Sequence, residues 1–504
     1  MLFNSYIFIL FFLPITLIGY FALNKYAYGK KGMSGIIWLF LMSLWFYGYE
    51  KPEFLILILG SILINFGISR VILFEKNKKP NCLQLQKWTM FLGVVFNLGI
   101  LFYFKYADFF VDSIEDFFHA EWNVEVALPL GISFFTFQQI SYIVDCYREE
   151  KGLHYNFFEY AAYVAFFPQL VAGPIVMHSE LVPQLQDKKN KVINYTNMSS
   201  GLYAFALGMG KKVLIADTLS KVVNVGFAQY KSLSSVAAFC VMLSYTLQIY
   251  FDFSGYCDMA LGMAKMFNVE LPYNFNSPYK AKSISEFWER WHMTLTRFFT
   301  QYVYIPLGGS RKGKLRTYLN IMFVFLLSGI WHGANWTFML WGIIHGLLKT
   351  GEKVIGDLKL KQKIKNPFME KGMNVVRTLA TFLLVNLAWV YFRADSIKRA
   401  NIFITRLWAG GYQLKTSTYD KINDMIEIRL LKRLGLAGIL NQYSWLPWIC
   451  MLVILTFAVF FMRNTQEKLQ TDKYNVRRSI VTIGILIWCI VSLSDISEFL
   501  YFNF

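Results

Sequence analysis

The sequence predicts an all-α polytopic membrane protein. Hydrophobic residues make up 56% of its 504 positions and charged residues only 16%, so the chain is far more apolar than a soluble protein of this length. Several apolar stretches approach the roughly 20 residues that a helix needs to cross a bilayer. Lysine and arginine gather between these stretches, as they do in cytoplasmic loops. We expect about 11 spans together with re-entrant segments.

The net charge and the cysteines exclude other classes of partner. A net charge of +18 does not indicate nucleic acid, because in so apolar a chain lysine and arginine face anionic membrane lipid. The six cysteines are scattered without a CxxC motif, which predicts neither a disulfide framework nor a metal site. We therefore expect membrane lipid as a partner, and no nucleic acid, metal or bound cofactor.

Residues 1–127 are predicted to form N-terminal transmembrane helices. The first apolar segment lacks a basic start and a small-residue cleavage site, so we expect a retained span and not a signal peptide. The predicted spans cover residues 2–23, 36–49, 54–72 and 90–104. The acidic segment 107–126 that follows contains no lysine or arginine, which predicts a loop on the external side.

Residues 128–350 form the predicted core, and its first part is broken. The apolar segments 128–144 and 157–176 are interrupted by Pro129, Gly131 and Pro168. Because broken helices at membrane depth need protein or water to satisfy the freed backbone groups, we expect re-entrant segments that line a cavity. Ordinary kinked spans that pack through small residues are the alternative.

The segment after residue 282 has the pattern of an amphipathic helix on the cytoplasmic side. Ser285 is placed as its N-cap, ahead of an acidic first turn. Trp288, Trp291, His292 and Leu295 follow the spacing i, i+3, i+4, i+7 and would share one face. His292 would then face the protein interior together with the tryptophans. It has either a functional role there or the role of a hydrogen-bonded structural histidine.

A histidine between two tryptophans, Trp331 and Trp336, lies in the apolar stretch 317–348. These 32 residues would span roughly 48 Å as one helix, well beyond the ~30 Å hydrocarbon core. Both ends are basic, so we expect the chain to enter, turn near residues 332–335 and return, leaving His332 deep in the membrane. An imidazole there is costly and usually functional, although a buried packing histidine is the alternative.

Residues 351–504 are predicted to contain C-terminal loops and transmembrane helices. Spans are expected at about 375–391, 448–462 and 479–493. The basic residues between 393 and 406 then fall on the external side, against the usual charge bias. Either the span count is off by one, or this segment is an amphipathic surface helix.

Six sequence blocks, in the same order, resemble the membrane-bound O-acyltransferases. The resemblance is greatest to the bacterial branch that includes the alginate O-acetylation membrane protein and the D-alanyl transfer protein of teichoic acid modification. The blocks are Leu128-Pro-Leu-Gly-Ile-Ser-Phe-Phe-Thr-Phe-Gln138, Phe167-Pro-Gln-Leu-Val-Ala-Gly-Pro-Ile175, Phe251-Asp-Phe-Ser-Gly-Tyr256, Phe287-Trp-Glu-Arg-Trp-His292, Ile305-Pro-Leu-Gly-Gly309 and Gly329-Ile-Trp-His332-Gly333.

The resemblance implies a multi-helix bundle around a central funnel or tunnel, in the cytoplasmic (inner) membrane of a bacterium. It implies that His332 is the catalytic histidine and His292 the second motif histidine. His332 would act as a general base between a cytoplasmic acyl thioester, such as acetyl-CoA, and an exported envelope polymer. Our candidates for binding substrate or the developing oxyanion are Asn335, Trp331, Trp336, Trp288, Trp291, Gln138 and Asp252.

The acyl group and acceptor are predicted by finer features of the resemblance. The chain length, Phe392-Arg393-Ala394 and the extended C-terminal part resemble the alginate type, which favours acetyl transfer to an exported polysaccharide or to peptidoglycan. A separate extracytoplasmic esterase-like acetyltransferase is then an implied partner. One alternative is D-alanyl transfer from a carrier protein to teichoic acid. Another is a transporter with His332 as a proton relay, but the internal repeats of such proteins are not evident in the sequence.

Overall fold

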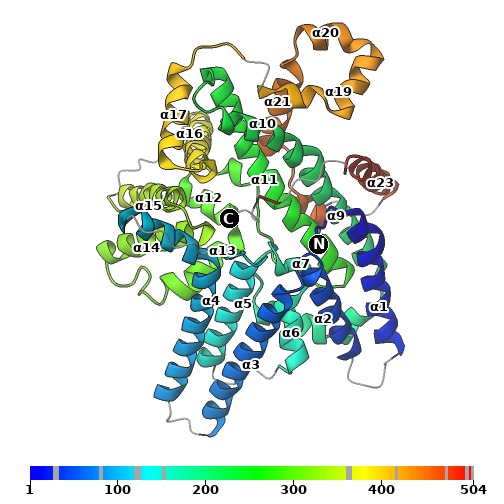
Figure 1. Cartoon of the computed structure of the whole chain (residues 1–504), viewed down its shortest axis with the longest axis vertical. Helices are drawn as coiled ribbons and strands as arrows, with labels where there is room; N and C mark the ends of the chain where they lie inside the picture. The colour runs from blue at the N-terminus through cyan, green and yellow to red at the C-terminus, as the bar shows by residue number, and fades with distance from the viewer. Residues whose placement is uncertain are drawn as a thin grey trace. The chain divides into compact units, whose positions relative to one another are not determined.

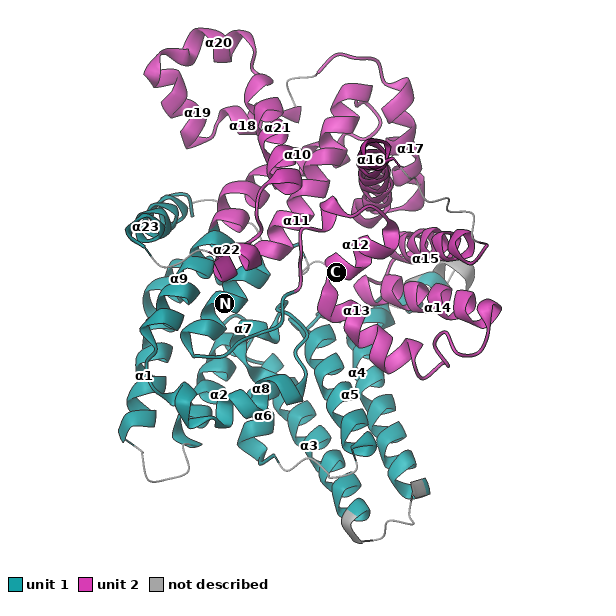
Figure 2. Ribbon diagram, turned by 180° about the vertical axis from the view of Figure 1, so that it is seen from behind, with its two compact units in different colours: residues 1–209, 256–273, 472–503 teal, residues 210–255, 274–471, 504 magenta. Residues whose placement is uncertain are grey.

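The computed structural model describes residues 1–26, 33–78, 83–118, 126–149, 155–358, 366–414, 418–471, 475–493 and 499–500. Within these ranges the ordered elements are helices and no strand is present, apart from an isolated bridge that pairs Phe275 with Trp291. The predicted all-α fold is confirmed. The chain forms two compact units (Figure 2): unit 1 comprises residues 1–209, 256–273 and 472–503, and unit 2 comprises residues 210–255, 274–471 and 504.

Unit 1 contains most of the N-terminal helices, among which α3, α4 and α5 run side by side (Figure 1). Every span predicted in residues 1–127 overlaps one of its helices. The helices of unit 1 are η1 (Phe8–Phe12, a π-helix), α1 (Leu13–Tyr26), α2 (Met33–Gly48), α3 (Phe54–Lys78), α4 (Leu83–Phe118), α5 (Ile132–Arg148), α6 (Phe157–Ala165), α7 (Phe167–Leu170), α8 (His178–Gln186), η2 (Lys188–Lys191, a 3₁₀-helix), α9 (Tyr195–Met209) and α23 (Val476–Val491).

The predicted breaks in the middle of the chain are present. Helix α5 starts directly after Gly131, whose φ of 71° is in the left-handed region. A Cβ at this position would lie 2.6 Å from the carbonyl oxygen of Leu170, so both the backbone conformation and the close approach require glycine. The second apolar segment is likewise interrupted between α6 and α7, at Phe166. That these breaks are re-entrant stays a prediction.

The loop predicted for the acidic segment 107–126 is wrong in its first half. Helix α4 continues to Phe118, and residues 119–125 lie outside the described part. Aromatic side chains continue one face of the helix past the predicted end, since the Phe102 ring contacts Tyr106 at 6.3 Å and Phe110 at 6.0 Å between centroids. Such contacts at helical spacing stabilise the helix.

Unit 2 contains the central part of the chain and most of its C-terminal part. Helix α11 (Ser235–Met266) starts in unit 2 and places its last turns, from Tyr256 on, in unit 1. The remaining helices of unit 2 are η3 (Gly210–Ala216, a π-helix), α10 (Asp217–Ala228), η4 (Pro278–Lys280), α12 (Ile284–Arg290), α13 (Met293–Phe299), η5 (Thr300–Tyr304), α14 (Lys314–His332), α15 (Trp336–Asp357), α16 (Pro367–Arg393), α17 (Ile397–Ala409), α18 (Asp420–Asn423), α19 (Ile426–Leu431), η7 (Lys432–Leu436), α20 (Ala437–Gln442), α21 (Leu446–Phe461) and α22 (Thr465–Thr471).

In the described part of the chain, 5 helices are long and apolar enough to cross a membrane. They cover Phe8–Tyr26, Phe54–Lys76, Gln84–Val111, Ser235–Met266 and Pro367–Arg393. The count rises to 6 if the pair Ile426–Gln442 and Leu446–Phe461, bent by 99°, forms one broken span. The figure of about 11 spans and the division into three domains stay predictions.

Helix α17 contains Lys398, Arg399 and Arg406, three of the basic residues whose side of the membrane the sequence did not settle, while Arg393 ends α16. It starts after Ser396, whose side chain caps the helix by accepting from the Arg399 N–H. One face is buried through Ala400 and Phe403, and the Phe403 ring stacks on Phe227 at 4.7 Å. A helix with a buried apolar face and charged flanks is what the amphipathic interpretation predicts.

The predicted reversal near His332 is confirmed as a turn between two helices. Helix α14 ends at His332 and α15 starts at Trp336, so the turn consists of residues 333–335. The two helices pack side by side (Figure 1). Glycines allow this packing: a Cβ at Gly329 would lie 2.4 Å from the Phe338 carbonyl oxygen, and one at Gly342 would lie 2.4 Å from the Phe325 carbonyl oxygen.

A Gly342→Ala substitution is therefore expected to force α14 and α15 apart and to destabilise the protein by about 1–3 kcal/mol. Gly351→Ala on the same helix is the matched control, because a Cβ there meets no atom within 4 Å. Thermal unfolding of the purified variants in detergent measures the difference. Equal unfolding midpoints for the two variants would show that the close approach has no energetic role.

Candidate active site

His332 lies at the end of α14 inside a ring of aromatic side chains. Its imidazole is buried, and its ring centroid lies 4.9 Å from Trp331, 5.1 Å from Trp341 and 5.1 Å from Phe392. These contacts come from α14, α15 and α16, so three helices fix the orientation of one imidazole. A histidine held in this way and excluded from water is suited to moving a proton at a defined position.

Asn335 and Trp336 lie just beyond the turn. The Asn335 Oδ1 caps α15 by accepting from the Thr337 N–H at 2.9 Å, and its Nδ2 donates to the Asp395 carbonyl oxygen at 3.1 Å. The structure therefore gives this amide a role in holding the turn, while its proposed contact with an oxyanion stays a prediction. Trp331 is buried beside His332, whereas Trp336 is exposed.

The single helix predicted around His292 is wrong, because the structure contains two short helices. Helix α12 ends at Arg290 and α13 starts at Met293, and His292 between them has a φ of 45° in the left-handed region. The N-cap is also corrected: Ser283, not Ser285, accepts from the Glu286 N–H at 3.1 Å. Left-handed backbone at a histidine is uncommon and clusters at functional sites.

Long-range backbone pairing explains the break. The Asn276 N–H donates to the Arg290 carbonyl oxygen at 2.9 Å, and the Met293 N–H donates to the Asn274 carbonyl oxygen at 3.0 Å. These bonds, with the bridge between Phe275 and Trp291, use backbone groups that a continuous helix would need internally. The helical spacing of the tryptophans gave no sign of this partner segment.

Asn274 also fixes the proton of His292. Its Oδ1 accepts from the Thr294 N–H at 3.2 Å and from the Thr294 hydroxyl at 3.0 Å, and it lies 3.1 Å from the His292 Nδ1. An oxygen that accepts from a backbone N–H is an acceptor for the imidazole as well, so Nδ1 carries the hydrogen. Nε2 is then the basic nitrogen of His292.

The two motif histidines lie together in unit 2. Their ring centroids are 6.5 Å apart, and the His292 ring also lies 6.0 Å from Trp331 and 4.8 Å from Phe253. Phe253 comes from α11, so four helices and the turn between α12 and α13 meet around the pair. The structure thus brings the two motif histidines together, while their catalytic roles stay a proposal.

His292 lies outside the helices that are long enough to cross a membrane, and burial lowers its pKa from 6.5 to about 3. The folded protein therefore stays unprotonated at this site while the unfolded chain binds a proton below pH 6.5. Stability from this group is present above pH 6.5 and is lost as the pH falls, by about 2 kcal/mol at pH 5.

A His292→Asn variant removes this titration and suits the left-handed backbone, which asparagine tolerates well. Between pH 7.5 and pH 5 the wild-type protein is expected to lose about 2 kcal/mol more stability than the variant. Unfolding in detergent at matched ionic strength measures the two losses. The same loss in both proteins would rule out the buried neutral imidazole.

The tryptophans predicted on one helical face line the wall of the same region. Trp288 donates from Nε1 to the His345 Nδ1 at 3.3 Å, and its ring lies 5.6 Å from Trp341. Trp291 lies 5.0 Å from Trp389. Trp341, Trp389 and Asn274 were missed from the sequence, while Phe253 and Phe392 were part of the family resemblance but were not expected at the site. The aromatic members look like ordinary core residues there, and Asn274 has no motif of its own.

Two predicted candidates are placed elsewhere. Asp252 belongs to a buried ion cluster, in which the Lys212 Nζ lies 2.7 Å from the Asp252 carboxylate and 2.8 Å from Asp217. Gln138 is buried in α5 of unit 1, where its backbone carbonyl oxygen accepts from the Ser141 and Tyr163 hydroxyls. A role for either side chain in substrate binding stays a prediction.

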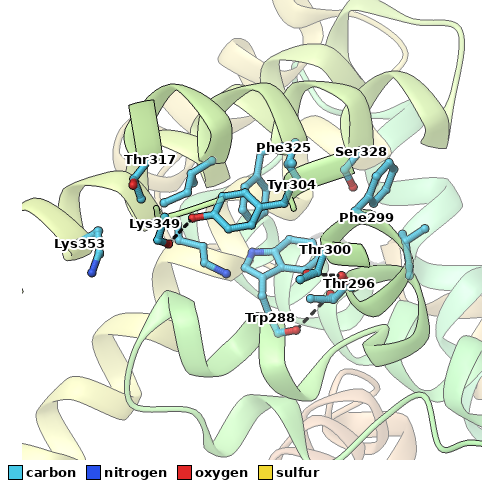
Figure 3. A pocket seen from close by; sticks show the side chains of 14 residues that line it. Trp288, Thr296, Phe299, Thr300, Tyr304, Thr317, Phe325, Ser328, Lys349 and Lys353 are labelled. Atoms are coloured by element: carbon cyan, nitrogen blue, oxygen red, sulfur yellow. Dashed lines mark hydrogen bonds between the residues drawn. The ribbon is translucent and has the colours of Figure 1, made fainter. Parts of the chain in front are cut away.

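A pocket of about 280 Å³ lies in unit 2 on the side of Trp288 (Figure 3). Trp288, Tyr304 and Phe325 provide aromatic walls, and Lys349 and Lys353 provide positive charge. The Lys349 Nζ lies 5.6 Å from the Phe325 ring centroid. The other lining residues are Leu295, Thr296, Phe299, Thr300, Ser310, Thr317, Ile321, Val324 and Ser328.

Comparison with known proteins decides the family. The model of the membrane-bound O-acyltransferase family matches residues 84–392, which include both histidines, their aromatic surroundings and the pocket. The chain belongs to the membrane-bound O-acyltransferase family. With its apolar helices, this acyltransferase is a multi-pass membrane enzyme that transfers an acyl group from a donor to an acceptor.

Relatives whose functions are named extend the comparison. This acyltransferase is 36% identical to the peptidoglycan O-acetyltransferase of Helicobacter pylori, over 100% of this chain and 98% of the relative. It is 37% identical to the "probable alginate O-acetylase AlgI" of Pseudomonas aeruginosa, over 79% of this chain and 73% of the relative. Identity to the teichoic acid D-alanyltransferase of Bacillus subtilis is 26%, over 44% of this chain and 58% of the relative.

Proposed function

We propose that this acyltransferase moves an acetyl group from cytoplasmic acetyl-CoA across the bacterial cytoplasmic membrane, for O-acetylation of an exported envelope polysaccharide or peptidoglycan. The observation that supports this proposal most strongly is the full-length similarity to a peptidoglycan O-acetyltransferase. The similarity to an alginate O-acetylase over most of the chain supports the same chemistry. The shorter and weaker similarity to a D-alanyltransferase makes D-alanyl transfer the less supported alternative.

In the proposed reaction His332 is the general base. Its neutral imidazole takes the proton of an acceptor hydroxyl as the hydroxyl oxygen attacks the thioester carbonyl carbon. The new C–O bond forms, the C–S bond breaks, and the proton passes from the imidazole to the departing thiolate. The products are an acetyl ester and free CoA thiol, so the reaction needs no further reactant.

His292 is proposed to act beside His332. The hydrogen bond from Nδ1 to Asn274 makes Nε2 the basic nitrogen, and the 6.5 Å between ring centroids supports a role for His292 toward the same substrate. We assign it to orient the acceptor or the thioester against His332. The tryptophans at positions 288, 291 and 331 exclude water around that substrate.

The donor is proposed to reach the histidines from the pocket beside Trp288. Lys349 and Lys353 at this pocket match the phosphates of CoA in charge, and the aromatic walls suit the apolar acyl–pantetheine arm. Trp288 contacts Trp341, which contacts His332, so one aromatic chain connects the pocket to the base. The acceptor is either the polymer itself or an extracytoplasmic esterase-like partner that completes the transfer.

Everted membrane vesicles test the acyl group. They are supplied either with radiolabelled acetyl-CoA or with a carrier protein charged with radiolabelled D-alanine, and label in the envelope polymer is counted. Acetyl label that appears only when the acyltransferase is present supports the proposal. Incorporation of D-alanine without acetyl would replace it with the alternative, and labelled substrate taken up unchanged would indicate a transporter.

A further inference from the structure

A second and larger pocket, of about 820 Å³, lies in unit 1 and has no part in the reaction proposed above. It is formed by the last turns of α1 on one side and by η2 with the start of α9 on the other. Its volume is within the range of small-molecule sites. The lining residues are Leu17, Ile18, Phe21, Ala22, Asn24, Lys25, Tyr26, Lys188, Lys191, Val192, Ile193, Tyr195 and Met198.

Three lysines make the pocket strongly positive. Lys25 comes from α1, while Lys188 and Lys191 come from η2, so both walls carry charge. Burial lowers the pKa of Lys191, because its ammonium is partly removed from water. Two carboxylates, Glu159 and Asp187, oppose this effect of burial on Lys191, and Asp187 also accepts from the Lys189 N–H at 2.9 Å. An anionic group in the pocket would therefore find cations on two sides.

The same pocket exposes apolar and aromatic side chains to the surroundings. Ile18, Val192 and Ile193 are exposed, and the residues Tyr26 and Tyr195 are more than four-fifths exposed, at 84% and 81%. Tyrosine is enriched at the membrane–water interface, where its ring is apolar and its hydroxyl meets the headgroups. Helix α1 belongs to the candidate span Phe8–Tyr26, so its last turn reaches the interface at this point.

We propose that this pocket binds an anionic phospholipid, with the phosphodiester headgroup between the three lysines and an acyl chain along the exposed face of α1. Basic pockets at the cytoplasmic ends of spans bind such headgroups, and lysine side chains reach the headgroups while their stems stay in apolar surroundings. The apolar wall of Leu17, Ile18 and Phe21 distinguishes a lipid from free phosphate, which would leave that wall uncovered.

The test measures phosphatidylglycerol binding to the purified full-length protein in detergent, by native mass spectrometry and by titration of a fluorescent phosphatidylglycerol. One phosphatidylglycerol is expected to stay bound, in preference to phosphatidylcholine. Neutralising the site with Lys25→Gln, Lys188→Gln and Lys191→Gln is expected to weaken binding about a hundredfold, since each lysine near a headgroup contributes about fivefold. Ile18→Asn leaves every charge in place. It is expected to weaken binding only through the lost apolar contact with the lipid's acyl chain.

The matched control replaces three exposed lysines outside the pocket, Lys231, Lys371 and Lys421, by glutamine. It removes the same charge and is expected to bind phosphatidylglycerol like the wild type. Equal weakening in both triple variants would overturn the proposal, as would equal binding of phosphatidylcholine. Full competition by inorganic phosphate, or capture of an acidic carrier protein by the lysines without lipid binding, would overturn it as well.

Discussion

Cells with a His332→Ala variant are expected to contain wild-type amounts of the acyltransferase in the membrane and no detectable acyltransferase-dependent O-acetyl groups on the envelope polymer. General-base catalysis contributes about 10²–10⁴ in rate, and the three aromatic rings hold the His332 imidazole at the end of α14, 6.5 Å from the His292 ring. The O-acetyl content is measured by mild alkaline release from the isolated polymer. The amount of protein is measured by immunoblot of the membranes.

His345 provides the control for this prediction. It is also buried and also lies among aromatic rings, 5.0 Å from Trp341, but its Nδ1 accepts from Trp288, which is a structural contact. His345→Asn keeps an acceptor at that position and is expected to retain most of the O-acetylation. Loss of acetylation in both variants at normal protein levels would mean that any disturbance of the aromatic cluster stops the enzyme, and would remove the special role of His332.

A Lys212→Met variant is expected to show the largest loss of stability. Lys212 in η3 is the cation between two carboxylates, Asp217 and Asp252, and all three side chains are buried. Removing it leaves both carboxylates in the interior without this ammonium. Breaking a buried ion pair by removing one partner costs about 3–5 kcal/mol, so the variant should unfold at a much lower temperature in detergent.

Two comparisons isolate the cause of this loss. Replacing the whole cluster by Lys212→Met, Asp217→Leu and Asp252→Leu is expected to recover much of the stability, because apolar groups of similar size remove the unbalanced charge. Lys265→Met removes a lysine that pairs with the exposed Glu270, a type of pair worth about 0–1 kcal/mol. If Lys212→Met were no more destabilising than Lys265→Met, the buried cluster would not stabilise the fold.

The turn at His332 could be predicted from the sequence because it follows from the length of the apolar stretch 317–348. A mostly apolar stretch of 32 residues cannot cross a bilayer once as a straight helix, and the small residues at positions 333 and 334 indicated where it turns. The structure has helices on both sides of that turn. The resemblance then added what length could not, namely that the histidine at the turn has a chemical role.

The region of His292 could not be predicted in the same way, because its structure depends on a partner far along the chain. Spacing favoured one helix, but Asn274 and Asn276 pair with the backbone of residues 290–293 and interrupt it. The N-cap was misplaced because Ser283 and Ser285 both precede acidic residues, and only the bond to the Glu286 N–H distinguishes them. Phe392 lies against His332 from a helix 60 residues later, where nothing in an apolar span indicates that contact.

The rate of acetyl transfer in everted membrane vesicles tests most closely whether His332 is the base of the reaction. Radiolabelled acetyl-CoA is supplied directly to the cytoplasmic face, and vesicles contain matched amounts of wild type, His332→Gln or His345→Asn. We predict that label enters the envelope polymer with wild type and His345→Asn, and at least about a hundredfold more slowly with His332→Gln. Transfer by His332→Gln at the wild-type rate would contradict the proposed mechanism.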